Sequence, residues 1–168
     1  MEQHNPYQSP RSVVADVGPQ LAGRGARLGA ALLDSVIMLA IVVPTMFIGG
    51  YFRALMEAAA AGEQVSILTQ LLWGLIGLAI FIAVQFLPLK NSGQTWGKKI
   101  VGLKIVNMAG EQPGLDVLLG RRYLFANGIS LIPFVGGLAS LVNVLMIFRA
   151  DKRCLHDLVA GTQVINAN

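Results

Sequence analysis

An acidic side chain lies inside an apolar stretch early in the chain. Asp34 is the only charged residue within residues 28–48. A carboxylate at the centre of a membrane helix costs about 2.5 to 3.5 kcal/mol, so it requires a partner. Arg27 lies seven residues earlier on the same helical face, although the axial gap of about 10 Å is long for direct contact. Two interpretations stay open for this pair, a buried structural contact and a cation or proton site.

A second candidate acid, Asp157, lies near the carboxyl end beside His156. Neighbouring residues on a helix point about 100° apart, and no nucleophile has a matching spacing. We therefore expect no hydrolytic site and no enzyme activity. Asp157 should instead accept hydrogen bonds from Arg27 or from helix-terminal amides at the membrane face. We predict that Arg27, Asp34 and Asp157 gather in one polar cluster at this face.

Metal and phosphate sites are not expected. Cys154 is the only cysteine, and His4 and His156 lie at opposite ends of the chain, so no metal-ligand spacing occurs and no cofactor is predicted. Residues 93–99, GQTWGKK, differ from a phosphate-binding loop, which needs four residues between its glycines and Ser or Thr after its lysine. Lys98 and Lys99 are predicted instead to contact anionic lipid headgroups or helix-terminal carbonyls.

The composition indicates that the elements around these residues lie in a membrane. Of 168 residues, 54% are hydrophobic and only 13% are charged, whereas an ordinary soluble domain has about a quarter charged. Three stretches without charged residues other than Asp34, at 28–48, 67–87 and 123–148, are each long enough to span a bilayer. We predict an all-α membrane protein, a small transmembrane helical bundle within residues 23–166, preceded by a disordered leader at 1–22.

The basic residues predict the orientation. Six of them lie in the loop 88–122, which the positive-inside rule places in the cytoplasm. Arg53 lies with two glutamates in the predicted outer loop, and the amino terminus and the tail 149–168 are predicted to be cytoplasmic. Arg121 and Arg122 end a predicted surface helix at 115–122 and should contact headgroups. This distribution explains the basic pI of 9.6 without a nucleic-acid partner.

The third apolar stretch has two interpretations. Proline and two glycines lie at its middle, within 132–137, where a helix most readily breaks. A helical hairpin that dips into the membrane and returns would keep the tail in the cytoplasm. The alternative is one tilted helix of 26 residues. We prefer the hairpin, because a single crossing would export the basic tail against the positive-inside rule.

A minor cytoplasmic β element is also predicted. Residues 100–106 are mostly β-branched, and apolar residues alternate along them as in a strand. Residues 162–165 have the same character and could pair with them.

Three motifs resemble the RDD family of bacterial membrane proteins. They are RLGAALLD at 27–34, GQTWGKKIVGLKIV at 93–106 and LHDLVAGT at 155–162. The resemblance places the arginine and two aspartates for which the family is named at Arg27, Asp34 and Asp157. Trp96 stands where the family more often has leucine. The resemblance implies a multi-pass protein of the bacterial inner membrane.

Two alternative functions stay open, and the resemblance implies the first of them. Transport is proposed for the family in general, with sodium/proton exchange attributed to some members, so a monovalent cation and a proton would be the substrates. The chain has no duplicated halves, so such a transporter would need to act as an oligomer. The alternative is a non-catalytic scaffold or assembly partner that interacts with membrane lipids, with itself or with another membrane protein, and whose Arg-Asp-Asp set is structural.

Overall fold

The computed structural model describes residues 20–132 and 135–167, and most of this chain is helical. The predicted leader therefore lies largely outside the described residues, as do Pro133, Phe134 and Asn168. In chain order the elements are α1 (Arg24–Ile48), α2 (Tyr51–Ala60), α3 (Ile67–Ser92), α4 (Trp96–Val101), β1 (Leu103–Asn107), the π-helix η1 (Asp116–Leu124), α5 (Phe125–Ser130), α6 (Val135–Leu145), the 3₁₀ turn η2 (Met146–Phe148), α7 (Leu155–Ala160) and β2 (Thr162–Asn166).

Helices α1 and α3 are long and apolar enough to cross a membrane. They contain 25 and 26 residues and extend the predicted stretches 28–48 and 67–87 at their ends. In neither helix is any part of the most apolar 18-residue window buried, unlike the core helix of a soluble protein. Helix α3 begins after Ser66, whose side chain accepts from the Thr69 amide at 3.2 Å, and ends at Gly93 in the left-handed conformation. Insertion into a membrane stays a prediction.

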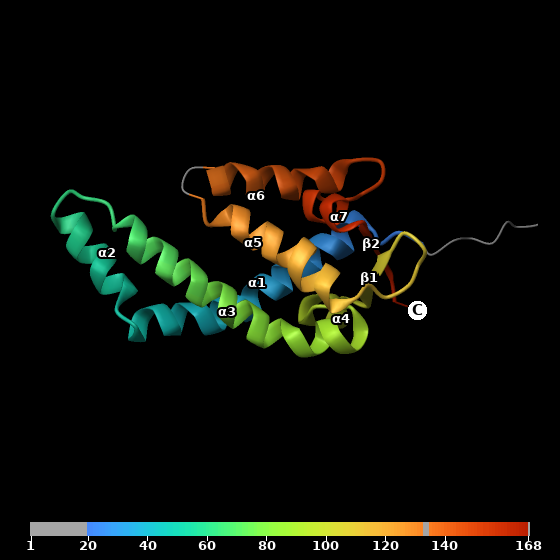
Figure 1. Ribbon diagram of the computed structural model, residues 1–168, viewed down its shortest axis with the longest axis horizontal. Coiled ribbons are helices and arrows are strands. Elements are labelled where there is room, and N and C mark those ends of the chain that lie inside the picture. Colours follow the sequence, from blue (N-terminus) through green and yellow to red (C-terminus); the bar gives the residue numbers. More distant parts are fainter. Residues whose placement is uncertain (1–19, 133–134, 168) are drawn as a thin grey trace, which may run out of the picture.

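The third apolar stretch folds back on itself. Its first part continues from η1 into α5, and its second part is α6, which packs against α5 (Figure 1). The Ser130 and Ser140 hydroxyls meet across the pair at 3.0 Å. A side chain at Gly136 would place its Cβ 2.5 Å from the Ser130 carbonyl oxygen, so glycine permits the close approach. The described parts of this stretch thus form two helices rather than one long helix.

The two predicted β segments pair, which confirms the minor sheet. Strands β1 and β2 are antiparallel, with Leu103 opposite Asn166. The predicted first strand is too long, because residues 96–101 form α4, which ends at Gly102 with a φ of 71°. The predicted leader is also too long. Leu21 bridges to Ile165, and the Ala22 amide donates to the Val164 carbonyl at 3.0 Å.

The buried apolar core lies at the sheet end of the molecule. It combines side chains from the segment before α1, the first turns of α1, the end of α3, both strands and η1, namely Ala22, Ala30, Leu89, Leu103, Ile105, Leu118 and Val164. Figure 1 shows α4, α7 and both strands gathered at this end, with α2 at the opposite end. The hairpin of α5 and α6 also begins and finishes there. This arrangement brings polar residues from distant parts of the sequence together.

Candidate functional site

Asp157 is the centre of a buried ionic cluster. It lies in the first turn of α7, and its carboxylate is fully buried. Arg27 from α1 donates from Nη2 to Asp157 Oδ2 at 2.6 Å. Arg122 from η1 donates from Nη1 to the other oxygen, Oδ1. The Cys154 amide donates to Oδ2 at 3.1 Å, so the same carboxylate also caps α7.

Further hydrogen bonds tie this ionic cluster to the strand and the tail. The Thr162 hydroxyl, at the start of β2, accepts from Arg122 and donates to Asp157 Oδ1 at 3.3 Å. Arg27 also donates to the Lys152 carbonyl. We call Arg27, Arg122, Asp157 and Thr162 the Asp157 cluster. Because they come from α1, η1, α7 and β2, the cluster fixes four elements relative to one another.

The opposite charges in the Asp157 cluster stabilise each other's ionised form. Burial alone would raise the pKa of Asp157, but the Arg122 and Arg27 guanidinium groups hold that pKa well below its ordinary range. Burial by itself would lower the pKa of Arg122. The charge of the Asp157 carboxylate outweighs this effect of burial and raises the pKa of Arg122. Both groups are therefore ionised at neutral pH. Such a pair is costly to break, because removal of one partner leaves a buried charge without compensation.

Asp34 does not join this cluster, which corrects the expectation of a single group. Its Oδ1 accepts from Gln85 Nε2 at 3.1 Å and from the Gly97 amide at 2.8 Å. Its Oδ2 accepts from the Thr95 hydroxyl and lies 3.9 Å from Lys98 Nζ. The physical reason is that α4 begins beside Asp34 and donates its Gly97 amide to that carboxylate, whereas Arg27 is directed to the tail. We call these residues the Asp34 cluster; they are Asp34, Gln85, Thr95, Gly97 and Lys98.

The four predicted headgroup contacts have different environments. Lys99 and Arg121 are exposed, and Lys99 lies over the Trp96 ring with its Nζ 5.6 Å from the ring centroid. The Lys98 side chain is only 14% exposed and faces Asp34. Arg122 is 1% exposed and paired with Asp157, so it does not lie on the surface beside Arg121. Neighbouring side chains on the π-helix η1 point in different directions, and only that of Arg122 faces inward to the Asp157 carboxylate.

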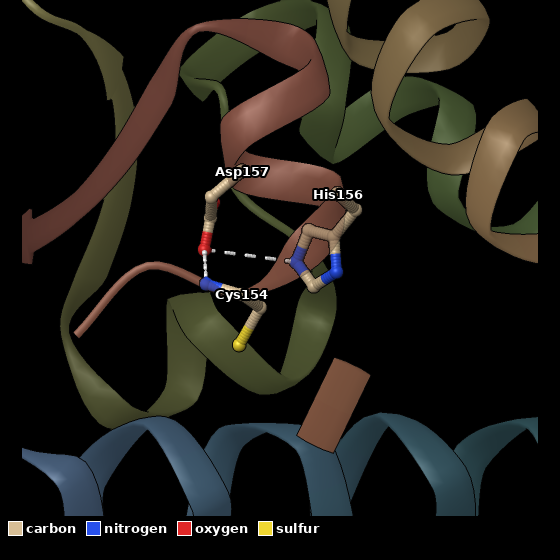
Figure 2. Close-up of side chains that lie close together, drawn as sticks. All are labelled: Cys154, His156 and Asp157. Atoms are coloured by element: carbon tan, nitrogen blue, oxygen red, sulfur yellow. Dashed lines mark hydrogen bonds and ion pairs between the residues drawn. The ribbon is translucent and has the colours of Figure 1, made fainter. Parts of the chain in front are cut away.

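Three potential metal ligands meet at the start of α7, although the spacing of cysteine and histidine in the sequence suggested none. The ligand atoms of Cys154, His156 and Asp157 lie within 4.8 Å of one another. Figure 2 shows the Asp157 carboxylate turned toward the Cys154 amide and the His156 ring. Both carboxylate oxygens already bind guanidinium groups of Arg27 and Arg122. A cation here would be repelled by two buried positive charges, so the donor set does not suit a metal ion.

His156 links α7 to the hairpin. Its ring Nδ1 lies 2.8 Å from Asn143 Oδ1 on α6, and its backbone amide donates to the same oxygen at 3.3 Å. Since a carbonyl oxygen only accepts, Nδ1 carries the proton in this bond. Burial, aided by the charge of Arg122, lowers the pKa of His156 to about 3. His156 is therefore neutral at physiological pH.

Sequence reasoning missed Gln85, Thr95 and the role of Arg122. Gln85 is the only amide side chain within residues 71–87, and an amide in an otherwise apolar helix is a signal for a buried hydrogen bond. Thr95 precedes α4 and accepts from the Lys98 amide at 3.4 Å, as an N-cap residue does. No local signal distinguishes Arg122 from the exposed Arg121.

The fold and these clusters define a helical protein of the membrane type, with two apolar helices of membrane length and a buried Arg-Asp-Arg cluster at one end. The chain matches the RDD family over residues 21–161, and it belongs to that family.

Two bacterial proteins have sequences similar to this chain. The chain is 35% identical to the uncharacterized protein YckC of Bacillus subtilis over 147 residues, which are 87% of this chain and 85% of that protein. It is 30% identical to an uncharacterized protein of Haemophilus influenzae over 93 residues, 55% of this chain and 57% of that protein. No solved structure matches the chain.

Proposed function

We propose that this protein is a multi-pass inner-membrane protein with a non-catalytic role as a scaffold or assembly partner, in which Arg27, Asp34 and Asp157 are structural. The observation that carries the proposal is that both aspartates are fully engaged by protein donors. Each oxygen of Asp157 binds an arginine, and each oxygen of Asp34 accepts a hydrogen bond. A transported cation would have to displace these donors.

The charge distribution supports a cytoplasmic location for the sheet end. Residues 149–153 and the start of α1 contribute basic side chains at this end, and α4 adds two lysines. At the opposite end, α2 carries Arg53 paired with Glu57 at 2.8 Å, so its charge is neutralised. Under the positive-inside rule the amino terminus and the tail both face the cytoplasm. The hairpin of α5 and α6 then enters the membrane from the cytoplasmic side and returns to it.

The exposed apolar surface supports contacts with lipid and with other membrane helices. Leu138, Leu141 and Leu145 on α6 are each more than half exposed. Glycines 25 and 29 on α1 have open space beside them, where a second helix can approach closely. We propose that a second copy of the chain or another membrane protein packs against these faces.

The deciding experiment is a flux assay on purified protein in proteoliposomes. The scaffold proposal predicts no sodium-dependent pH change above that of empty vesicles. It also predicts that Asp34→Asn lowers the yield and thermal stability of the purified protein, because the Asp34 cluster holds α4 against α1 and α3. The matched control is Asp151→Asn, whose carboxylate lies in an exposed pair with Arg149. A sodium-dependent flux that Asp34→Asn abolishes in folded protein would contradict the scaffold proposal.

A second candidate function, cation/proton exchange by an oligomer, is favoured by one observation. A cavity of about 140 Å³ lies between α5 and α6. Its polar lining is uncharged and comes from Asn127, Ser130, Ser140, Asn143 and His156. Such a lining could pass a small hydrated ion along the hairpin. If this path is used, Ser140→Leu should abolish the flux while Ser35→Leu, an exposed position on α1 outside the cavity, should not.

A further inference from the structure

A second cavity, of about 150 Å³, lies between α1, α4 and the end of α6. One wall is cationic, with side chains of Arg27, Lys98 and Arg122. The Nε of Arg122 is buried and has no hydrogen-bond partner among the described residues. A buried guanidinium N–H without a partner is uncommon, because its desolvation is not compensated. Three cationic side chains thus line the cavity, and one of them has a buried donor without a partner among the described residues.

Part of the lining of this cavity is apolar. It is formed by Leu28 and Ala31 of α1 together with Val144 and Ile147 at the end of the hairpin. Leu28 is 47% exposed and Val144 is 51% exposed, so the apolar wall continues onto the outer surface of the molecule. The cavity therefore meets the surface that faces lipid in the proposed orientation. A ligand for this site needs an anionic group and an apolar group side by side.

Positive charge also exceeds negative charge around the cavity. Residues 24–34 and 149–157 contain five basic residues and three acidic residues, and Lys98 and Arg122 add to the excess. Two of the three carboxylates, those of Asp34 and Asp157, are already bound by donors of their own clusters. The remaining one, Asp151, pairs with Arg149. An anion in the cavity would therefore meet a net positive field and no free carboxylate among these residues.

We propose that this cavity binds the phosphate headgroup of an anionic phospholipid, whose acyl chains lie along Leu28 and Val144 outside it. The volume is about five times the share of one water molecule in the liquid, enough for a phosphate group but not for an entire lipid. The apolar wall favours a lipid over inorganic phosphate, because a free ion would leave that wall unused. The proposal rests on the membrane location proposed above, and it adds a specific ligand site.

The test is native mass spectrometry of the purified full chain in detergent with added phosphatidylglycerol or phosphatidylcholine. We expect one phosphatidylglycerol to remain bound per chain and phosphatidylcholine to bind more weakly. Lys98→Gln should weaken phosphatidylglycerol binding about fivefold, the effect of one lysine near an anionic headgroup. Lys99→Gln is the matched control, since Lys99 is exposed and does not line the cavity.

A second pair of variants tests the cavity itself without a change in charge. Ala31→Phe places a ring in the cavity and should abolish retention of the lipid. Ala40→Phe places the same ring at an exposed position of the same helix and should leave binding unchanged. Thermal unfolding of each variant shows that it is folded, so a loss of lipid is not mistaken for a loss of structure.

Three outcomes would overturn the proposal. Equal retention of the two lipids would show that the site has no preference for an anion. An equal loss in Lys98→Gln and Lys99→Gln would show general surface attraction instead of a site. Displacement of the lipid by millimolar inorganic phosphate would assign the site to a free anion. These three outcomes concern the lipid site alone, because each is measured on protein that detergent has extracted from membranes. A chain that is absent from the membrane fraction would instead contradict the proposed function.

Discussion

Arg122 and Asp157, 35 residues apart in the sequence, form a fully buried ion pair that joins η1 to α7. Arg27 binds the other oxygen of the same carboxylate from a position 130 residues away. The three side chains therefore connect the start of the first apolar helix, the entry of the hairpin and the tail. Their removal should affect the whole sheet end and not a single loop.

Asp157→Asn should destabilise the protein strongly. The amide cannot balance two buried guanidinium groups, and breaking a buried ion pair from one side costs about 3 to 5 kcal/mol. Thermal unfolding of the detergent-purified protein, followed by circular dichroism, measures the loss. Asp151→Asn, which removes a carboxylate from an exposed pair, should leave the midpoint unchanged. Equal midpoints for both variants would show that the Asp157 cluster contributes nothing to stability.

Gly97→Ala should separate α4 from α1. An added Cβ would lie 2.2 Å from the Ala30 carbonyl oxygen and 2.8 Å from Asp34 Cγ, so α4 must move and its amide contact with Asp34 is weakened. Overpacking of this kind costs about 1 to 3 kcal/mol. Gly29→Ala is the control, because nothing lies within 4 Å of the added Cβ there. The same unfolding measurement distinguishes the two, and an unchanged midpoint in Gly97→Ala would contradict the close approach.

Stability should fall as the pH is lowered from about 6.5 toward 3. His156 has a pKa of about 3 in the folded protein against 6.5 as a model value, so the unfolded chain binds a proton in this window and the folded chain does not. The stabilisation is complete above pH 6.5 and decreases by up to about 1.4 kcal/mol per pH unit below it. Asp157, whose folded pKa is also depressed, adds its own loss only below its ordinary pKa of 3.8.

The pH dependence is tested by comparing the wild type with His156→Gln. Glutamine keeps a donor for Asn143 but does not titrate. The difference in unfolding midpoint between the two proteins should shrink as the pH falls from 6.5 to 4.5. The positive groups near His156 are Arg27, Lys98 and Arg122, and none of them titrates in this range. A difference that stays constant with pH would show that His156 is not the titrating group.

The Cys154 thiol should react slowly with iodoacetamide in the folded protein. The thiol is buried. Burial is the main cause that raises its pKa, and the nearby Asp157 carboxylate raises it further, so little thiolate is present at neutral pH. Alkylation should become fast in denaturant, which mass spectrometry of the intact chain can follow. Rapid labelling without denaturant would show that the start of α7 opens readily.

Cysteine labelling can also decide the orientation. In a Cys154→Ala background, a cysteine at Ala61, between α2 and α3, should react with a membrane-impermeant maleimide in intact cells. Cysteines at Ala109, after β1, and at Ala167, after β2, should react only after the membrane is opened. Labelling of Ala167→Cys from outside would mean that the third apolar stretch crosses the membrane once, and that the hairpin does not return.

The sequence by itself was sufficient for the coarse architecture. Runs of apolar residues predict α1 and α3, because a helix of membrane length needs an unbroken run of such side chains. The alternation near 100–106 and 162–165 predicts the strand pair, although the start of the first strand was wrong because α4 is capped by Thr95 and stabilised by Asp34. The three motifs predict the RDD family, in agreement with the match over residues 21–161.

Only the tertiary structure decided how the charged side chains are paired. Arg27 and Asp34 share a helical face, yet each has a different partner, because the tail returns beside Arg27 and α4 begins beside Asp34. Arg121 and Arg122 are equivalent as sequence, but only Arg122 faces inward from η1. Helical periodicity determines which residues share a face, whereas the path of the chain determines what that face meets. A buried charge then pairs with whichever opposite charge or donor that path brings within hydrogen-bond distance.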